Sequence, residues 1–285
     1  MIFTISELQA LDASAIHHAI AFNGGHITVR QWGTGSPIVL LHGGSGSWKH
    51  WVKNISALVE SGRTVLVPDM PGFGESAAPL IGQDADVLPE PIELALDQII
   101  PNLRYELVAF SFGSMVAAQM VTRQPERISK LVLSGSPALG INELRPFKLR
   151  PWNDLSEGPA RDAIHRHNLG VLMLSSIAAV DDLALYIHSS NLNSDRMKRR
   201  RLAYTDFLLQ LLKQIHCPVF GIWGALDVLY RDNHAAVQKA LEQAPNFKGL
   251  EFIAEAGHWA QFERPEQFNS ALLKALNQSL QEANH

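Results

Sequence analysis

The chain has 285 residues, of which 46% are hydrophobic and 18% are charged. This composition excludes long disordered stretches and supplies enough apolar side chains for a sheet that is covered on both faces. The formal net charge of −4 offers no general electrostatic attraction for nucleic acids or anionic membranes, so we expect a small hydrophobic substrate rather than a nucleic-acid partner.

The N-terminal residues lack the basic and apolar regions of a secretory signal. The longest apolar-rich stretch, at 170–180, is too short to span a bilayer. We therefore predict a cytoplasmic protein without membrane insertion. Cys217 is the only cysteine, which excludes an internal disulfide. Its place beside Pro218, at the start of a predicted strand, favours a buried structural thiol.

The first 135 residues alternate between predicted strands and helices. Two strands separated by Gly24 and Gly25 indicate a hairpin, and the uninterrupted apolar run at 38–42 is typical of a central strand. In chain order the pattern predicts strands at 17–22, 26–33, 38–42, 63–69, 105–110 and 129–135, and helices at 48–61, 91–100 and 112–124. This alternation indicates a mostly parallel, doubly wound sheet.

The alternation of strands and helices stops in the second half of the chain, where helical patterns follow one another without a convincing strand. Helices are predicted at 158–174, 181–191 and 195–214, and then a strand at 218–224, a helix at 233–244, a strand at 250–255 and a helix at 265–280. We therefore predict an α/β core formed by 1–139 and 213–285, with a helical insertion at 140–212.

Ser111 lies where the predicted strand at 105–110 passes into the next helix. The order small-x-Ser-x-Gly, from Ala109 to Gly113, is what a nucleophile elbow needs. A serine on so tight a turn has a strained backbone, and its neighbours two residues away must be small to let strand and helix approach. Because alanine replaces the usual glycine at position 109, the motif alone leaves an ordinary buried serine open.

A base and an acid for Ser111 follow the later strands. Asp227 comes after the strand at 218–224, and His258 comes after the strand at 250–255. Ligand-facing groups lie at the carboxyl ends of strands in an open parallel sheet. The order serine, aspartate, histidine is the one found in α/β-hydrolases, so these residues form a candidate catalytic triad.

The loop after the strand at 38–42 could supply an oxyanion hole. We expect one backbone donor from Gly44 and a second from Phe112, while His42 is predicted to be structural. The same glycine-rich loop raises the alternative of dinucleotide binding, but Lys49 occupies the position of the third glycine.

The histidines show no spacing typical of a metal site. His165 and His167, for example, lie on different faces of their predicted helix, so neither a metal nor a cofactor is predicted. The run MKRRR at 197–201 is typical of a solvated helix face. An arginine in or next to this run could nevertheless face a substrate carboxylate, the candidates being Arg196, Arg199, Arg200 and Arg201.

Taken together, the motifs resemble those of the α/β-hydrolase superfamily over essentially the whole chain. The matching stretches are HGGSGSW, DMPGFGES, AFSFG, GALD and AGHWAQFERPEQFN. The resemblance implies that the insertion at 140–212 is a helical cap that closes over the site. The last motif is most similar to the meta-cleavage product hydrolases, which cut a carbon–carbon bond in ring-opened aromatic compounds and use a cap arginine for the substrate carboxylate.

Two positions depart from that subfamily. Its oxyanion loop usually carries Gly-Pro-Gly where this chain has GGSGS, and its serine usually follows an asparagine where this chain has Phe110. We therefore expect hydrolysis of an ester or related acyl bond, with carbon–carbon bond cleavage as the alternative and a binding protein with little turnover as a third. Phe110 and Trp259 are expected to form an apolar wall of the substrate pocket.

Overall fold

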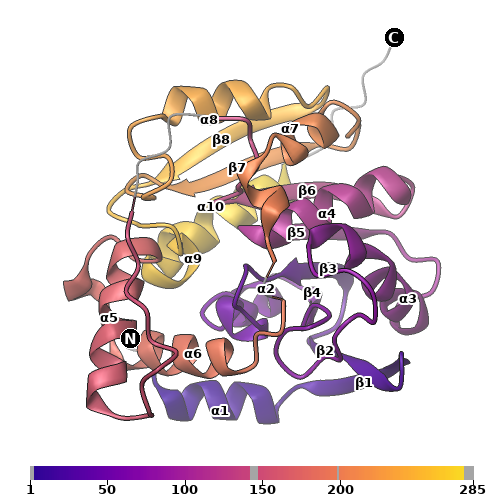
Figure 1. Ribbon diagram of the computed structural model, residues 1–285. Helices are drawn as coiled ribbons and strands as arrows, with labels where there is room; N and C mark the ends of the chain where they lie inside the picture. Colours follow the sequence, from indigo (N-terminus) through magenta and orange to yellow (C-terminus); the bar gives the residue numbers. More distant parts are fainter. Residues whose placement is uncertain (1–2, 142–146, 198, 279–285) are drawn as a thin grey trace.

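The protein is built around one sheet of eight strands, seen in a computed structural model that describes residues 3–141, 147–197 and 199–278. The spatial order is β1-β2-β4-β3-β5-β6-β7-β8. The strands are β1 (Ile16–Phe22), β2 (Gly25–Trp32), β3 (Ser36–Leu41), β4 (Arg63–Pro68), β5 (Tyr105–Phe110), β6 (Ile128–Ser134), β7 (Val219–Gly224) and β8 (Phe247–Ile253). Helices cover both faces of the sheet (Figure 1).

The helices complete a three-layer arrangement. They are α1 (Ile5–Ala13), α2 (Ile55–Glu60), α3 (Pro89–Ile99), α4 (Phe112–Arg123), α5 (Pro159–Leu172), α6 (Asp182–Asn193), α7 (Phe207–Leu212), α8 (His234–Leu241), α9 (Ala260–Glu263) and α10 (Pro265–Asn277), with short 3-10 turns η1 (Trp48–Trp51), η2 (Ala85–Val87), η3 (Ile177–Ala179) and η4 (Arg201–Tyr204). No helix in the described ranges is long and apolar enough to cross a membrane.

The sheet is parallel except at one end. β1 pairs antiparallel with β2, and β2 pairs antiparallel with β4, whereas all the remaining pairs are parallel. The predicted hairpin and the mostly parallel sheet are thus confirmed. Because β3 and the strands from β5 to β8 run in one direction, their carboxyl ends meet at one edge of the sheet, where loops from distant parts of the sequence come together.

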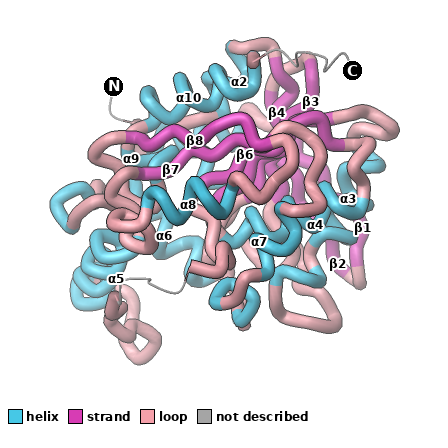
Figure 2. Tube along the Cα trace, turned by 90° about the horizontal axis from the view of Figure 1, so that it is seen from above, coloured by secondary structure: helices cyan, strands magenta, loops and turns pink. Residues whose placement is uncertain are grey.

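Alternate residues of the central strands pack into two separate apolar layers, one on each face of the sheet. Leu40 and Val108 are fully buried on the face covered by α2 and α10. Leu41 and Leu107 are fully buried on the opposite face, against α3 and α4. Figure 2 shows α2 and α10 on one side of the sheet and α3, α4 and α8 on the other. Burial on both faces explains why these strands read as continuous apolar runs.

Two local predictions for the N-terminal half need correction. The predicted helix at 48–61 is divided into η1 and α2. Asn54 lies at the break, and its side chain donates hydrogen bonds to the Gln261 carbonyl and to Oδ1 of Asn269, so tertiary contacts compete with a continuous helix. Helix α1 was not predicted, although the reciprocal hydrogen bonds between Thr4 and Glu7 form a capping box that the sequence shows.

Between β6 and β7 the described residues contain helices and no strand, as predicted; residues 142–146 of the predicted insertion lie outside the described ranges. The predicted helix at 195–214 is wrong in its first part, because regular helix begins only at α7. Asp195 accepts a hydrogen bond from the Met197 N–H, and the Arg196 N–H donates to the Gly72 carbonyl. These contacts replace helical hydrogen bonds and join the segment to the loops of the core.

Candidate active site

Ser111 stands on a strained turn between β5 and α4. Its φ of 50° and ψ of −122° lie in a region that non-glycine residues rarely adopt, and its N–H donates to the Ser134 carbonyl at 2.8 Å. A β-carbon added to Gly113 would lie 2.5 Å from the His42 carbonyl oxygen, so only glycine fits where the helix approaches β3. The turn therefore has the strain and the crowding expected of a nucleophile elbow.

The three predicted triad residues form a hydrogen-bonded series with His258 in the middle. His258 Nε2 is 3.0 Å from Ser111 Oγ, and His258 Nδ1 is 2.8 Å from Asp227 Oδ2. The carboxylate can only accept, so Nδ1 carries the proton and Nε2 is free to accept the serine hydroxyl. Asp227 is fully buried, and its Oδ1 accepts the Leu229 N–H at 3.0 Å, which fixes the carboxylate.

Space for the His258 ring depends on a glycine at the end of β6. Gly135 has a φ of 55°, and an added β-carbon there would lie 2.9 Å from His258 Cε1. The ring also packs against Phe110, with a centroid distance of 5.0 Å. Phe110 and Trp259 are both buried, and Trp259 Nε1 donates to the His50 carbonyl. Both aromatic residues thus support the histidine loop in this structure.

His42 fixes the direction of one peptide in the predicted oxyanion loop. Its Nδ1 lies 2.8 Å from the Gly43 carbonyl, and its Nε2 accepts the Met70 N–H at 3.0 Å. The carbonyl can only accept, so Nδ1 carries the proton. Burial lowers the pKa of His42, which favours this neutral form. In a trans peptide the C=O and N–H groups point in opposite directions. Holding the Gly43 carbonyl therefore also sets the direction of the Gly44 N–H.

His50 supports the same loop from the other side. Its Nδ1 accepts the Gly43 N–H at 3.2 Å, and its ring packs edge-on against Phe110 and tilted against Trp259. Burial lowers the pKa of His50 well below its ordinary value, so the ring remains a neutral acceptor. This role of His50 was not predicted, because nothing in the pattern WKHW distinguishes a loop support from a helix side chain.

Among the four candidate arginines, Arg200 is the one that reaches the oxyanion loop. A β-carbon added to Gly44 would lie 2.9 Å from Arg200 Nη1 and 3.3 Å from Nε. Its guanidinium group also lies 5.7 Å from the centre of the Phe112 ring. Nη2 binds Ser45 Oγ and the Asp195 carboxylate, whereas the buried Nε has no partner among the described residues. The arginine therefore retains one unpaired donor, Nε, beside Gly44.

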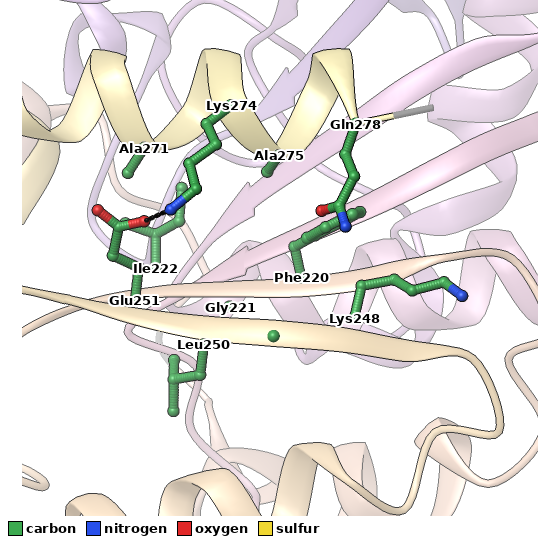
Figure 3. Close-up of a pocket in the computed structure, with 11 residues that line it drawn as sticks. Phe220, Gly221, Ile222, Lys248, Leu250, Glu251, Ala271, Lys274, Ala275 and Gln278 are labelled. Carbon is green, nitrogen blue, oxygen red and sulfur yellow. Dashed lines mark hydrogen bonds and ion pairs between the residues drawn. The ribbon is translucent and has the colours of Figure 1, made fainter. Parts of the chain in front are cut away.

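Two cavities differ in their relation to this site. A cavity of about 460 Å³ is lined by 138–141, 203–206 and Tyr230. Of its lining residues, Tyr230 also contacts the triad, because its N–H donates to the Asp227 carbonyl; its hydroxyl donates to the Ser136 carbonyl. A smaller cavity of about 130 Å³ lies between α10 and strands β7 and β8 (Figure 3) and includes none of the predicted site residues.

The chain is similar to known proteins of one fold family. A family model described as the alpha/beta hydrolase fold matches residues 36–170. The 2-hydroxy-6-oxo-6-phenylhexa-2,4-dienoate hydrolase of Burkholderia cepacia is 26% identical over 263 residues, which cover 88% of this chain and 91% of that protein.

Solved structures show the same fold at lower sequence identity. The naproxen esterase of Bacillus subtilis gives a TM-score of 0.73 at 19% identity and covers 95% of both chains. A meta-cleavage product hydrolase from Pseudomonas fluorescens gives a TM-score of 0.70 at 20% identity, covering 89% of this chain and 95% of that one. The chain therefore has the α/β-hydrolase fold, and the resemblance to that superfamily predicted from its motifs is confirmed.

Proposed function

We propose that the protein is a serine-dependent hydrolase that cleaves an ester or related acyl bond of a small hydrophobic substrate. The observation that carries this proposal is the continuous hydrogen-bonded series Ser111–His258–Asp227, with distances of 3.0 and 2.8 Å. A serine hydroxyl becomes a useful nucleophile at neutral pH only when a base takes its proton and an acid holds that base. The three side chains lie together at the carboxyl edge of the sheet, which supports the proposal.

In the proposed reaction His258 Nε2 takes the Ser111 proton as Oγ attacks the substrate carbonyl. Asp227 holds the ring and stabilises the imidazolium, and the N–H groups of Gly44 and Phe112 stabilise the oxyanion. Imidazolium then gives its proton to the leaving group as the acyl-enzyme forms. Water, deprotonated by His258, attacks the acyl-enzyme, and the released serine regains its proton. The cycle requires no cofactor.

The helical insertion is the proposed cap over this site. Its contacts with the oxyanion loop support that role, since Ser47 Oγ donates to Asn191 Oδ1 and Ser45 Oγ donates to Asp195 Oδ2, both at 2.6 Å. The cavity bordered by 203–206 of the insertion and by Tyr230 is a candidate space for the acyl or aryl group.

Carbon–carbon bond hydrolysis is the second candidate, and Arg200 is the observation that favours it. The Burkholderia relative is named for a dienoate substrate, which bears a carboxylate. The unpaired Nε of the Arg200 guanidinium, beside Gly44, is suited to such a group. Phe110, fully buried before the serine, is the residue that favours ordinary ester hydrolysis instead.

A substrate panel distinguishes these candidates. Hydrolysis of p-nitrophenyl esters of different acyl length would be measured beside hydrolysis of a 2-hydroxy-6-oxodienoate, with Ser111→Ala as the control. Ester turnover that disappears in the control supports the first candidate, and a strong preference for the dienoate replaces it with the second. Binding of these compounds without any turnover would contradict both and favour a binding protein.

A further inference from the structure

Glu263 lies at the end of α9, five residues after His258, and its carboxylate accepts hydrogen bonds from two separate segments. Oε2 accepts the Gly257 N–H at 2.7 Å, one residue before His258. Both carboxylate oxygens lie 3.0 Å from the Ser175 backbone nitrogen, and Oε1 also accepts the Ser175 hydroxyl. Ser175 belongs to the turn at 173–175 of the helical insertion, after α5.

The same turn contacts the histidine loop directly through the backbone. The Trp259 N–H donates to the Met173 carbonyl at 2.7 Å. A β-carbon added to Gly257 would lie 2.4 Å from the Leu174 carbonyl carbon and 2.6 Å from the Ser175 nitrogen, so no side chain fits between the two backbones. The residues on both sides of His258 are therefore bound to the helical insertion.

We infer that Glu263 is a positioning residue that couples the seating of the helical insertion to the orientation of His258. The inference rests on the proposed role of His258 as the general base. Hydrogen bonds to a carboxylate are stronger than those between neutral groups, and this carboxylate joins the turn at 173–175 to Gly257. When the insertion is seated, the histidine loop is held from both sides; when the turn at 173–175 moves away, the loop loses these bonds.

Glu263→Gln tests this coupling with little change in shape. An amide has only one acceptor oxygen and places an NH2 group against the N–H donors that the carboxylate accepted. Ser175→Ala is a milder second variant, because it removes the hydroxyl donor and leaves the backbone N–H. Glu266→Gln is the matched control, since Glu266 is exposed in the first turn of α10.

The most direct measurement is hydrogen exchange at the Trp259 backbone amide. Selective labelling with 15N-tryptophan makes this amide easy to resolve, because the chain has only six tryptophans. This amide donates to the Met173 carbonyl and not to Glu263. Its exchange therefore becomes faster only if the substitution also lets the turn at 173–175 separate from the histidine loop. We expect exchange to be faster by about tenfold in Glu263→Gln, as for the loss of one ordinary hydrogen bond, less accelerated in Ser175→Ala, and unchanged in Glu266→Gln. Unchanged exchange at Trp259 in Glu263→Gln would overturn the coupling.

The catalytic consequence has its own measurement. A displaced base slows chemistry, so the rate of fluorophosphonate labelling and kcat should fall about 10- to 100-fold in Glu263→Gln, with KM changing less than kcat. Equal labelling rates in Glu263→Gln and wild type would overturn the positioning role. If Ser111 of the wild-type protein is not labelled at all, the proposed function fails, while exchange at Trp259 still decides whether the insertion and the histidine loop are coupled.

Discussion

At the scale of single residues, the direction of the Gly44 N–H depends on one buried histidine. Asparagine can place an N–H near the position of histidine Nδ1, whereas glutamine reaches the position of Nε2. We therefore expect His42→Asn to retain the bond to the Gly43 carbonyl and His42→Gln to lose it. The predicted result is a kcat for His42→Gln lower by about 10- to 100-fold, with a smaller loss in His42→Asn.

Steady-state kinetics on one ester would check this prediction, with KM expected to change little in either variant because the oxyanion forms only in the transition state. Equal activity in the two variants would show that the bond from Nδ1 does not position the loop. A large rise in KM at unchanged kcat would instead mean that His42 acts through substrate binding.

Arg200 is the residue whose substitution separates substrate classes. Arg200→Gln should lower kcat/KM for a carboxylate-bearing substrate by about 10- to 100-fold, the range for a hydrogen bond to a charged group, while neutral esters are much less affected. Arg199 is exposed and offers the matched control, Arg199→Gln. The measurement is the ratio of kcat/KM for the two substrate types. An equal loss on both types would contradict a role in carboxylate binding.

At the scale of elements, prediction from sequence succeeded where one local signal decided the outcome. The continuous apolar runs identified β3 and β5, and the small-x-Ser-x-Gly pattern placed Ser111 on a strained turn. Because the carboxyl ends of parallel strands lie at one edge of the sheet, the proximity of Asp227 and His258 to Ser111 could also be predicted without any information on contacts.

Elements that depend on distant partners were not predictable in the same way. The segment at 195–200 has a helical composition, yet it makes bonds to Ser45, Gly72 and Ser76 that no local pattern indicates. Because the backbone of this segment is not helical, the sequence could not show which of the four arginines reaches the oxyanion loop. Glu263 belongs to the motif AGHWAQFERPEQFN, but its partner Ser175 lies 88 residues away in the chain.

At the scale of the whole molecule, buried histidines should make folding sensitive to mild acid. Burial lowers the pKa of His42 and His50, and it lowers the pKa of His188 to about 3. These groups remain neutral in the folded protein but take up protons in the unfolded chain below a pH of about 6.5. The free energy of unfolding should therefore decrease as the pH falls below that value, by up to about 1.4 kcal/mol per pH unit for each group.

His188→Asn isolates one of these contributions. Its free energy of unfolding, measured by denaturant titration between about pH 6 and pH 4, should depend less steeply on pH than that of the wild type. The difference in slope should correspond to up to about one fewer proton taken up on unfolding. His26→Asn, at an exposed position, serves as the control. The same pH dependence in His188→Asn and wild type would contradict a neutral His188 imidazole in the folded protein.

The central claim is that Ser111 is a nucleophile activated by His258, and covalent labelling tests it most directly. The protein would be incubated with a fluorophosphonate, digested, and the modified peptide identified by mass spectrometry. We predict a single adduct on Ser111, none in Ser111→Ala, and labelling slower by at least about 100-fold in His258→Ala, since the base supplies that order of acceleration. An unlabelled Ser111, or labelling that persists in Ser111→Ala, would contradict the proposed mechanism.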